Sequence, residues 1–88
     1  MSNIDVVIFR KDNCVKCKMT KQVFEGYGVS PNLAQIYNAD GTVTSEAQAL
    51  MDSYSIKSAP IVVVKDENGA VVDVWSDFQI GKIKALVA

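Results

Sequence analysis

The chain has 88 residues, of which 49% are apolar and 22% charged, and its formal net charge is −1. A chain of this size forms one domain, residues 1–88, with a modest core. The balanced charge gives no reason to expect nucleic acid or a membrane as a partner, and no apolar run approaches the roughly 18 residues of a membrane span. Since the start of the sequence does not resemble a signal peptide either, we expect a cytoplasmic monomer.

The first part of the chain predicts a strand, a helix and a second strand. Residues 5–10 form the first strand, because Val6-Val7-Ile8-Phe9 is continuously apolar, as in a central strand covered on both faces. A helix is expected from Val15 to about Tyr27, and Leu33 to Tyr37 form the next strand. The apolar face of this helix is predicted to consist of Met19, Val23, Phe24 and Tyr27.

The middle of the chain predicts a second helix and a hairpin. Residues 44–54 are helical, and their apolar face consists of Ala47, Leu50, Met51 and Tyr54. Residues 61–64 and 70–74 form two strands. They are antiparallel, because Asp66-Glu67-Asn68-Gly69 between them is a strong hairpin signal.

Ser76, with Gln79 three residues later, is typical of a helix start. Ser76 is therefore expected to cap a last helix, which buries Ile80, Ile83 and Val87. The resulting order, βαβαββα, predicts an α/β fold with right-handed crossovers and helices on both faces of the sheet. We expect a four-stranded mixed sheet flanked by three helices.

The only two cysteines, Cys14 and Cys17, stand at the start of the first predicted helix. At this spacing they can reach one another and close a small disulfide ring. The unpaired N–H groups of a helix start and the helix dipole favour an anion, so they favour the reactive thiolate form of Cys14. In a reducing compartment, a cysteine pair of this kind indicates redox chemistry.

Other interpretations of these residues exist. Structural zinc needs four Cys or His ligands, and the chain has two Cys and no His, which excludes a zinc site within one chain. A zinc or iron–sulfur site that bridges two copies stays open, as does a purely structural disulfide. Lys11, Lys16 and Lys18 are either solvated charges or cations that activate the thiolate and meet acidic partner residues.

Three motifs resemble the NrdH redoxins, glutaredoxin-like proteins of the thioredoxin superfamily. Residues 9–17, Phe9-Arg10-Lys11-Asp12-Asn13-Cys14-Val15-Lys16-Cys17, are close to that family's active-site strand and loop. Residues 54–60 resemble the segment that ends at the cis-proline of thioredoxins and glutaredoxins, and residues 75–78 resemble the family's Trp-Ser-Gly-Phe signature. The resemblance covers nearly the whole chain and implies a thioredoxin-like fold.

The expected activity is that of a protein thiol-disulfide oxidoreductase with no bound cofactor. From their positions, Cys14 is the exposed nucleophile, and Cys17, one helical turn further in and more buried, is the resolving thiol that closes the Cys14–Cys17 disulfide. Pro60 is expected in a cis peptide that faces the pair. The residues expected to contact a partner are Lys11, Val15, Lys16, Ala59, Trp75, Ser76, Asp77 and Phe78. Without the family resemblance, Trp75 and Phe78 would be assigned to the core.

The resemblance implies ribonucleotide reductase as electron acceptor and thioredoxin reductase, with NADPH, as electron source. The alternative is a glutathione-dependent glutaredoxin. Lys11 stands where glutaredoxins keep a cation for glutathione, so it does not distinguish a glutathione-dependent glutaredoxin from an NrdH redoxin. The lack of a Pro-Tyr pair between the cysteines, and of a Gly-Gly pair before the last helix, argues against glutathione.

The chain departs from the NrdH pattern at two positions. Lys16 replaces the usual glutamine between the cysteines, and Asp77 replaces the glycine of the signature. Asp77 is expected in the first turn of the last helix, where the dipole favours a carboxylate. The same carboxylate would stand near the charged end of glutathione and disfavour its binding.

Overall fold

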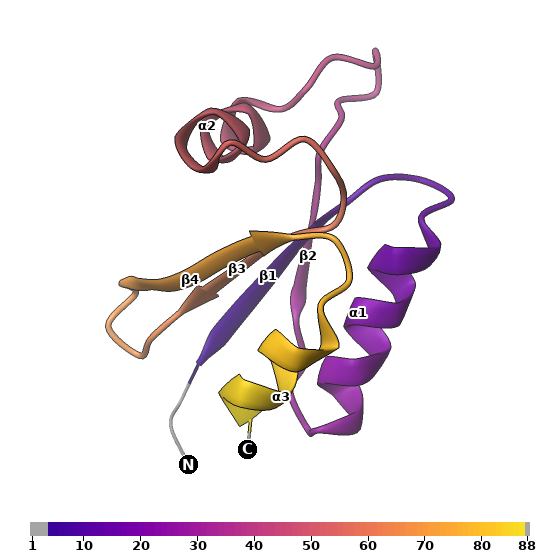
Figure 1. Ribbon diagram of the computed structural model, residues 1–88. Coiled ribbons are helices and arrows are strands. Elements are labelled where there is room, and N and C mark those ends of the chain that lie inside the picture. The colour runs from indigo at the N-terminus through magenta and orange to yellow at the C-terminus, as the bar shows by residue number, and fades with distance from the viewer. Residues whose placement is uncertain (1–3, 88) are drawn as a thin grey trace.

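The computed structural model describes residues 4–87, and within them four strands form one sheet with three helices packed around it (Figure 1). The strands are β1 (Asp5–Arg10), β2 (Asn32–Gln35), β3 (Ile61–Lys65) and β4 (Val71–Ser76), and the helices are α1 (Val15–Gly26), α2 (Ser45–Tyr54) and α3 (Ile80–Val87). The strand order is β2-β1-β3-β4; β1 pairs with β2 in parallel, and the other two pairs are antiparallel. The predicted βαβαββα order and mixed sheet are confirmed.

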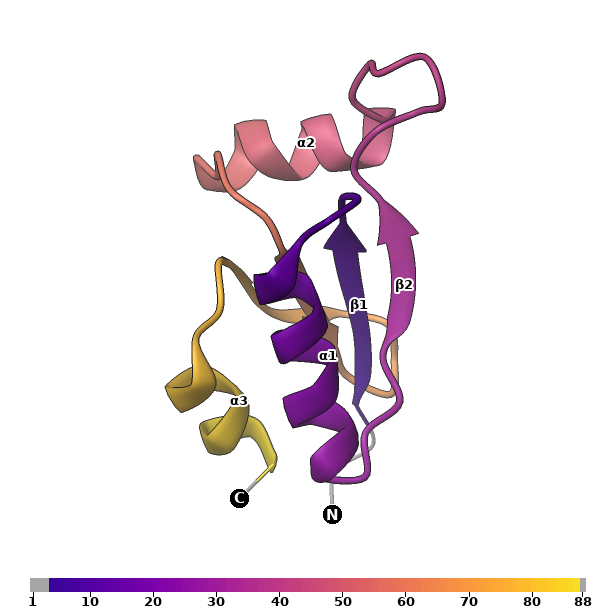
Figure 2. The same cartoon turned by 90° about the vertical axis from the view of Figure 1, so that its right-hand side faces the viewer.

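The sheet separates two cores, since its central strands β1 and β3 bury side chains on both faces. On one face, α1 and α3 lie side by side, as Figures 1 and 2 show, while α2 lies beyond the other face, near the carboxyl end of β1. The buried residues on the α1 and α3 side are Val6, Ile8, Phe24, Val62, Val64, Trp75 and Ile83. Those on the α2 side are Phe9, Ile36, Ala47, Ile56, Ile61 and Val63.

The buried face of α1 differs from the predicted one. Phe24 is fully buried as expected, but Met19 and Tyr27 are 39% and 46% exposed, and the helix instead turns Cys17 and Thr20 inward. A polar residue is tolerated there because the Thr20 hydroxyl donates to the main-chain carbonyl of Lys16, at 2.8 Å. On α2 and α3, Ala47 and Ile83 are buried as predicted, Leu50, Met51 and Val87 are half-buried, and Tyr54 and Ile80 are exposed.

The end of β4 and the start of α3 also correct the prediction. Trp75 pairs with Val62 and Ser76 with Ile61, so β4 continues to Ser76 and α3 begins only at Ile80. Ser76 therefore does not cap α3, because pairing with β3 outweighs the local capping signal. Its hydroxyl accepts a hydrogen bond from the Ser58 hydroxyl at 3.3 Å.

The remaining boundaries agree more closely with the sequence. Thr44 caps α2 by accepting a hydrogen bond from the N–H of Ala47, at 3.3 Å. The Asp66–Gly69 turn joins β3 and β4, and Gly69 supplies the left-handed conformation that the turn needs, with φ of +82°. β2 ends at Gln35 rather than Tyr37, which forms an isolated bridge with Val43. Among residues 4–87, no helix is long and apolar enough to cross a membrane.

Candidate active site

The register of the sheet brings three distant segments to one end of the molecule. Phe9 near the end of β1 pairs with Ile61 at the start of β3, and Ile61 pairs with Ser76 at the end of β4. The turn after β1, the segment before β3 and the loop after β4 therefore meet there. The cysteine pair lies on the first of these segments.

Cys14 is the N-cap residue of α1, and it forms a disulfide with Cys17. Their Cα atoms are 5.3 Å apart, and the Cys14 Sγ accepts a hydrogen bond from the N–H of Cys17 at 3.1 Å. This is the helix-start N–H expected from the sequence, and in the reduced protein an N–H at this place favours a thiolate on that sulfur. Cys14 is only 8% exposed, so the expectation of an exposed Cys14 is wrong: as the N-cap residue it folds its side chain over the end of the helix, against the N–H of Cys17. Cys17, at 4%, is the more buried of the two, as expected.

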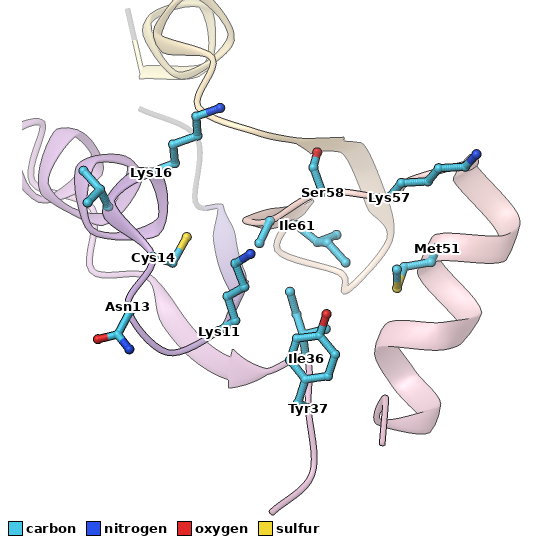
Figure 3. Close-up of a pocket in the computed structure, with 12 residues that line it drawn as sticks. Lys11, Asn13, Cys14, Lys16, Ile36, Tyr37, Met51, Lys57, Ser58 and Ile61 are labelled. Atoms are coloured by element: carbon cyan, nitrogen blue, oxygen red, sulfur yellow. The ribbon is translucent and has the colours of Figure 1, made fainter. Parts of the chain in front are cut away.

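A pocket of about 420 Å³ opens beside Cys14 (Figure 3). It is lined by Lys11, Asn13, Cys14, Val15, Lys16, Ile36, Tyr37, Met51, Lys57, Ser58, Ala59 and Ile61. Cys17 is not among these residues, which makes Cys14 the sulfur on the side that a substrate can approach. The pocket includes Lys11, Val15, Lys16 and Ala59 of the expected contact residues.

The other residues that line the pocket were not predicted from the sequence, although signals for some of them were present. Lys57 and Ser58 directly precede Ala59-Pro60. Ile36 and Tyr37 follow β2, and the carboxyl ends of adjacent parallel strands meet at one edge of a sheet, where ligands bind. Met51 carried no such signal, because it lies on the apolar stripe of α2.

The segment around Pro60 has the predicted backbone conformation, but Pro60 does not itself line the pocket. The Ala59–Pro60 peptide is cis, as predicted. Pro60 itself is fully buried, and its neighbours Ala59 and Ile61 line the pocket in its place. The Pro60 carbonyl accepts a hydrogen bond from the N–H of Asp77 at 2.9 Å, which ties the loop after β4 to this segment.

The sequence model of the glutaredoxin family matches residues 6–68, a stretch that contains both cysteines, Pro60 and every residue that lines the pocket. The chain belongs to the glutaredoxin family. It is a thiol-disulfide oxidoreductase of that family, with Cys14 and Cys17 as its redox-active pair. A search of curated protein sequences gave no match.

Solved structures agree on the fold. NrdH-redoxin from Escherichia coli, described as a glutaredoxin-like protein with a thioredoxin-like activity profile, matches with a TM-score of 0.70 and 22% identity over 93% of each chain. A glutaredoxin from Archaeoglobus fulgidus matches with a TM-score of 0.63 and 21% identity, over 99% of this chain and 87% of that one. The oxidised thioredoxin of Plasmodium falciparum matches with a TM-score of 0.59 and 18% identity, over 99% of this chain and 84% of that one. The fold is thioredoxin-like.

Trp75 and Phe78 of this glutaredoxin do not form an exposed docking surface. Trp75 is 4% exposed and belongs to the core under α1 and α3, while Phe78 is half-buried and packs against the same core. Lys82 lies 5.5 Å from the centre of the indole ring and forms an ion pair with Asp73 at 3.2 Å, which shields the ring further. The core interpretation is correct for both aromatic residues.

Asp77 lies in the loop before α3, not in its first turn, because α3 begins at Ile80. Its backbone is left-handed, with φ of +71°, a conformation that glycine adopts freely and that aspartate tolerates better than most residues. Its carboxylate forms an ion pair with the Lys16 ammonium at 2.9 Å. The two departures from the NrdH pattern are therefore partners in the structure.

This ion pair affects the titration of Asp77. The hydrogen bond from Lys16, and a second one from the N–H of Phe78, hold the pKa of the Asp77 carboxyl below its ordinary value. The pKa of Asp77 is lower in the folded than in the unfolded chain. The ion pair therefore stabilises the fold at pH values above the ordinary carboxyl pKa. That stabilisation is lost as the pH falls through the lowered value.

We predict that Lys16→Gln raises the titration midpoint of Asp77 towards that of an unpaired carboxyl. Carboxyl chemical shifts measured by NMR between about pH 2 and pH 6 would show the change. Asp40 provides the control, because hydrogen bonds from Thr42, not from Lys16, lower its pKa. If the Asp77 midpoint is the same with and without Lys16, the ion pair does not form in solution.

Proposed function

We propose that this glutaredoxin is a dithiol electron carrier of the NrdH-redoxin type, with Cys14 as nucleophile and Cys17 as resolving thiol. The Cys14 thiolate attacks one sulfur of a substrate disulfide, and the other substrate sulfur leaves as a thiolate. The Cys17 thiolate then attacks Cys14, which releases the first substrate sulfur. Two electrons pass from the dithiol to the substrate, whose two thiolates take up the two protons that the cysteines lose.

The observation that carries this proposal is the placement of the two sulfurs. Cys14 lines the pocket and accepts the N–H of Cys17, whereas Cys17 lies behind it on the core side of α1. A substrate disulfide can therefore approach Cys14 first, and the resolving thiol is already within bonding reach. The helix start supports a thiolate at the position where attack begins.

The partners belong to the same proposal. The Trp-Ser-Asp-Phe segment and the CVKC loop resemble the NrdH redoxins, which implies ribonucleotide reductase as the electron acceptor. Thioredoxin reductase would return the oxidised protein to the dithiol form with electrons from NADPH. We further propose that the protein acts as a monomer in the cytoplasm, where such reductases keep thiols reduced.

A glutathione-dependent glutaredoxin is the second candidate, favoured by the charges of the pocket. Lys11 and Lys57 both line it, and neither forms an ion pair with another residue of the described range 4–87. Two such cations can bind the carboxylates of glutathione. The repulsion expected from Asp77 is reduced, because Lys16 balances its charge.

Reduction by the two electron sources separates these candidates. The oxidised protein is supplied either with NADPH and thioredoxin reductase, or with NADPH, glutathione and glutathione reductase, and NADPH consumption is followed at 340 nm. We expect rapid reduction only by thioredoxin reductase. The matched control is the Cys14→Ser, Cys17→Ser double variant, which should consume no NADPH above background. Equal or faster reduction by glutathione would reject the NrdH-type proposal in favour of the second candidate.

A further inference from the structure

Lys16 occupies an unusual place in the site. It lies between the two cysteines and lines the pocket with Cys14, yet its ammonium is bound to the Asp77 carboxylate at 2.9 Å. In Figure 3 the end of the Lys16 side chain points away from the middle of the pocket, whereas Lys11 points into it. Asp77 is not among the residues that line the pocket, so Lys16 contributes to the pocket wall while its ammonium is held at the edge of the pocket.

Asp77 is suited to hold a flexible side chain in this way. Its N–H donates to the Pro60 carbonyl at 2.9 Å, and its carboxylate accepts from the N–H of Phe78 at 2.8 Å. The acceptor is thus fixed at both its main chain and its side chain. A lysine side chain is flexible and its ammonium has three donors, so Lys16 can take the conformation that brings its ammonium to the fixed carboxylate.

We propose that Asp77 is a positioning residue that keeps the Lys16 ammonium away from the interior of the pocket, and so limits both the thiolate fraction of Cys14 and the attraction of anionic disulfides. The proposal rests on the proposed function in one respect, that Cys14 is the nucleophile. The titratable or charged side chains that line the pocket with Cys14 are Lys11, Lys16, Tyr37 and Lys57. Of the three lysines, only Lys16 has its ammonium bound to Asp77.

The expected size of the effect follows from simple electrostatics. A unit charge that moves to within about 8 Å of a partly hydrated thiolate shifts its titration by roughly 0.5 pH unit. Below the midpoint, that shift corresponds to about threefold more thiolate at a given pH. A change of this size is measurable by alkylation rates.

The first experiment measures the pH profile of alkylation by iodoacetamide, a neutral reagent, in a Cys17→Ser background. Asp77→Asn should lower the midpoint of Cys14 by about 0.5 pH unit and raise the rate at pH 6 about threefold. Asparagine tolerates the left-handed backbone and keeps an acceptor for Phe78, so the fold is retained. Asp77→Gly, which restores the residue of the NrdH signature, should have the same effect.

A double-variant cycle tests whether Asp77 acts through Lys16. In a Lys16→Gln background, Asp77→Asn should leave the midpoint unchanged, because no cation remains to be released. An equal downward shift in both backgrounds would mean that the carboxylate repels the thiolate directly, and would overturn the proposal. No shift in either background would overturn it as well.

The second experiment compares two model disulfides of different charge. With the anionic 5,5′-dithiobis(2-nitrobenzoate), Asp77→Asn should accelerate the reaction of Cys14 about threefold more than with the neutral 4,4′-dithiodipyridine. If Asp77→Asn accelerated the reaction equally with both disulfides, Asp77 would have no effect on the attraction of anionic substrates.

Peptide mapping of the singly alkylated protein, with both cysteines present, tests separately which cysteine is the nucleophile. If Cys17 carries the label, the proposed function fails; if Cys14 carries it and Asp77→Asn changes nothing, only this inference fails.

Discussion

Cys17→Ser should convert the protein into a trap that holds a substrate as a stable mixed disulfide, while Cys14→Ser should hold nothing. The reason lies in the placement of the sulfurs: Cys14 lines the pocket and starts the reaction, and Cys17 supplies the only thiol in the chain that can release the intermediate. Both variants should lose turnover in disulfide reduction down to the uncatalysed rate. Non-reducing gel electrophoresis followed by mass spectrometry would identify the trapped species.

The same variants test the activation of Cys14. In Cys17→Ser, the remaining thiol accepts an N–H from the first turn of α1, so it should react with iodoacetamide at pH 7 faster than a model thiol such as N-acetylcysteine. Cys14→Ser keeps one thiol of equal chemistry in a more buried place, and it provides the matched control. If Cys14 reacts no faster than the model thiol, the helix start does not activate it.

Phe24→Ala should produce the largest loss of stability among single substitutions on α1. The ring is fully buried between α1, the sheet and α3, and its removal leaves a cavity in the core that also contains Ile8, Trp75 and Ile83. Such substitutions cost about 3–5 kcal/mol. A domain of 88 residues has a total stability of only about 4–13 kcal/mol, so much of the fold's stability would be lost.

Urea unfolding followed by the fluorescence of Trp75, the only tryptophan in the chain, would measure this loss. Met19→Ala is the matched control, because Met19 lies on the same helix but is 39% exposed. It should cost less than about 1 kcal/mol. If Met19→Ala cost as much as Phe24→Ala, the apolar stripe expected from the sequence would be the buried face of α1, and the observed orientation of the helix would be wrong.

The order of the elements and the nature of the chemistry were determined by the sequence alone. The apolar run at residues 6–9 and the hairpin signal at 66–69 are local features, and each acts within a few residues of itself. The cysteine pair is local in the same sense, since a helix start and a disulfide both involve residues three apart. These signals needed no knowledge of distant contacts.

Where local signals competed with long-range pairing, only the tertiary structure decided. Ser76 and Gln79 carry a sound capping pattern, but Ser76 pairs with Ile61 and stays in β4. Trp75 belongs to a motif that resembles a docking signature, but pairing with Val62 turns it into the core. A strand that joins a sheet gains several hydrogen bonds and buries apolar surface, which outweighs one helix cap.

The pocket and its charges also depended on the fold. Lys11, Tyr37, Met51 and Lys57 come from four segments that meet only because the sheet register places them at the same end. Lys16 and Asp77 each depart from the family pattern, and no local signal in the sequence connects them. Their ion pair forms because β4 returns beside β3 and brings its last loop to the start of α1. A side-chain pair between distant segments depends on three-dimensional distance, which a single sequence does not contain.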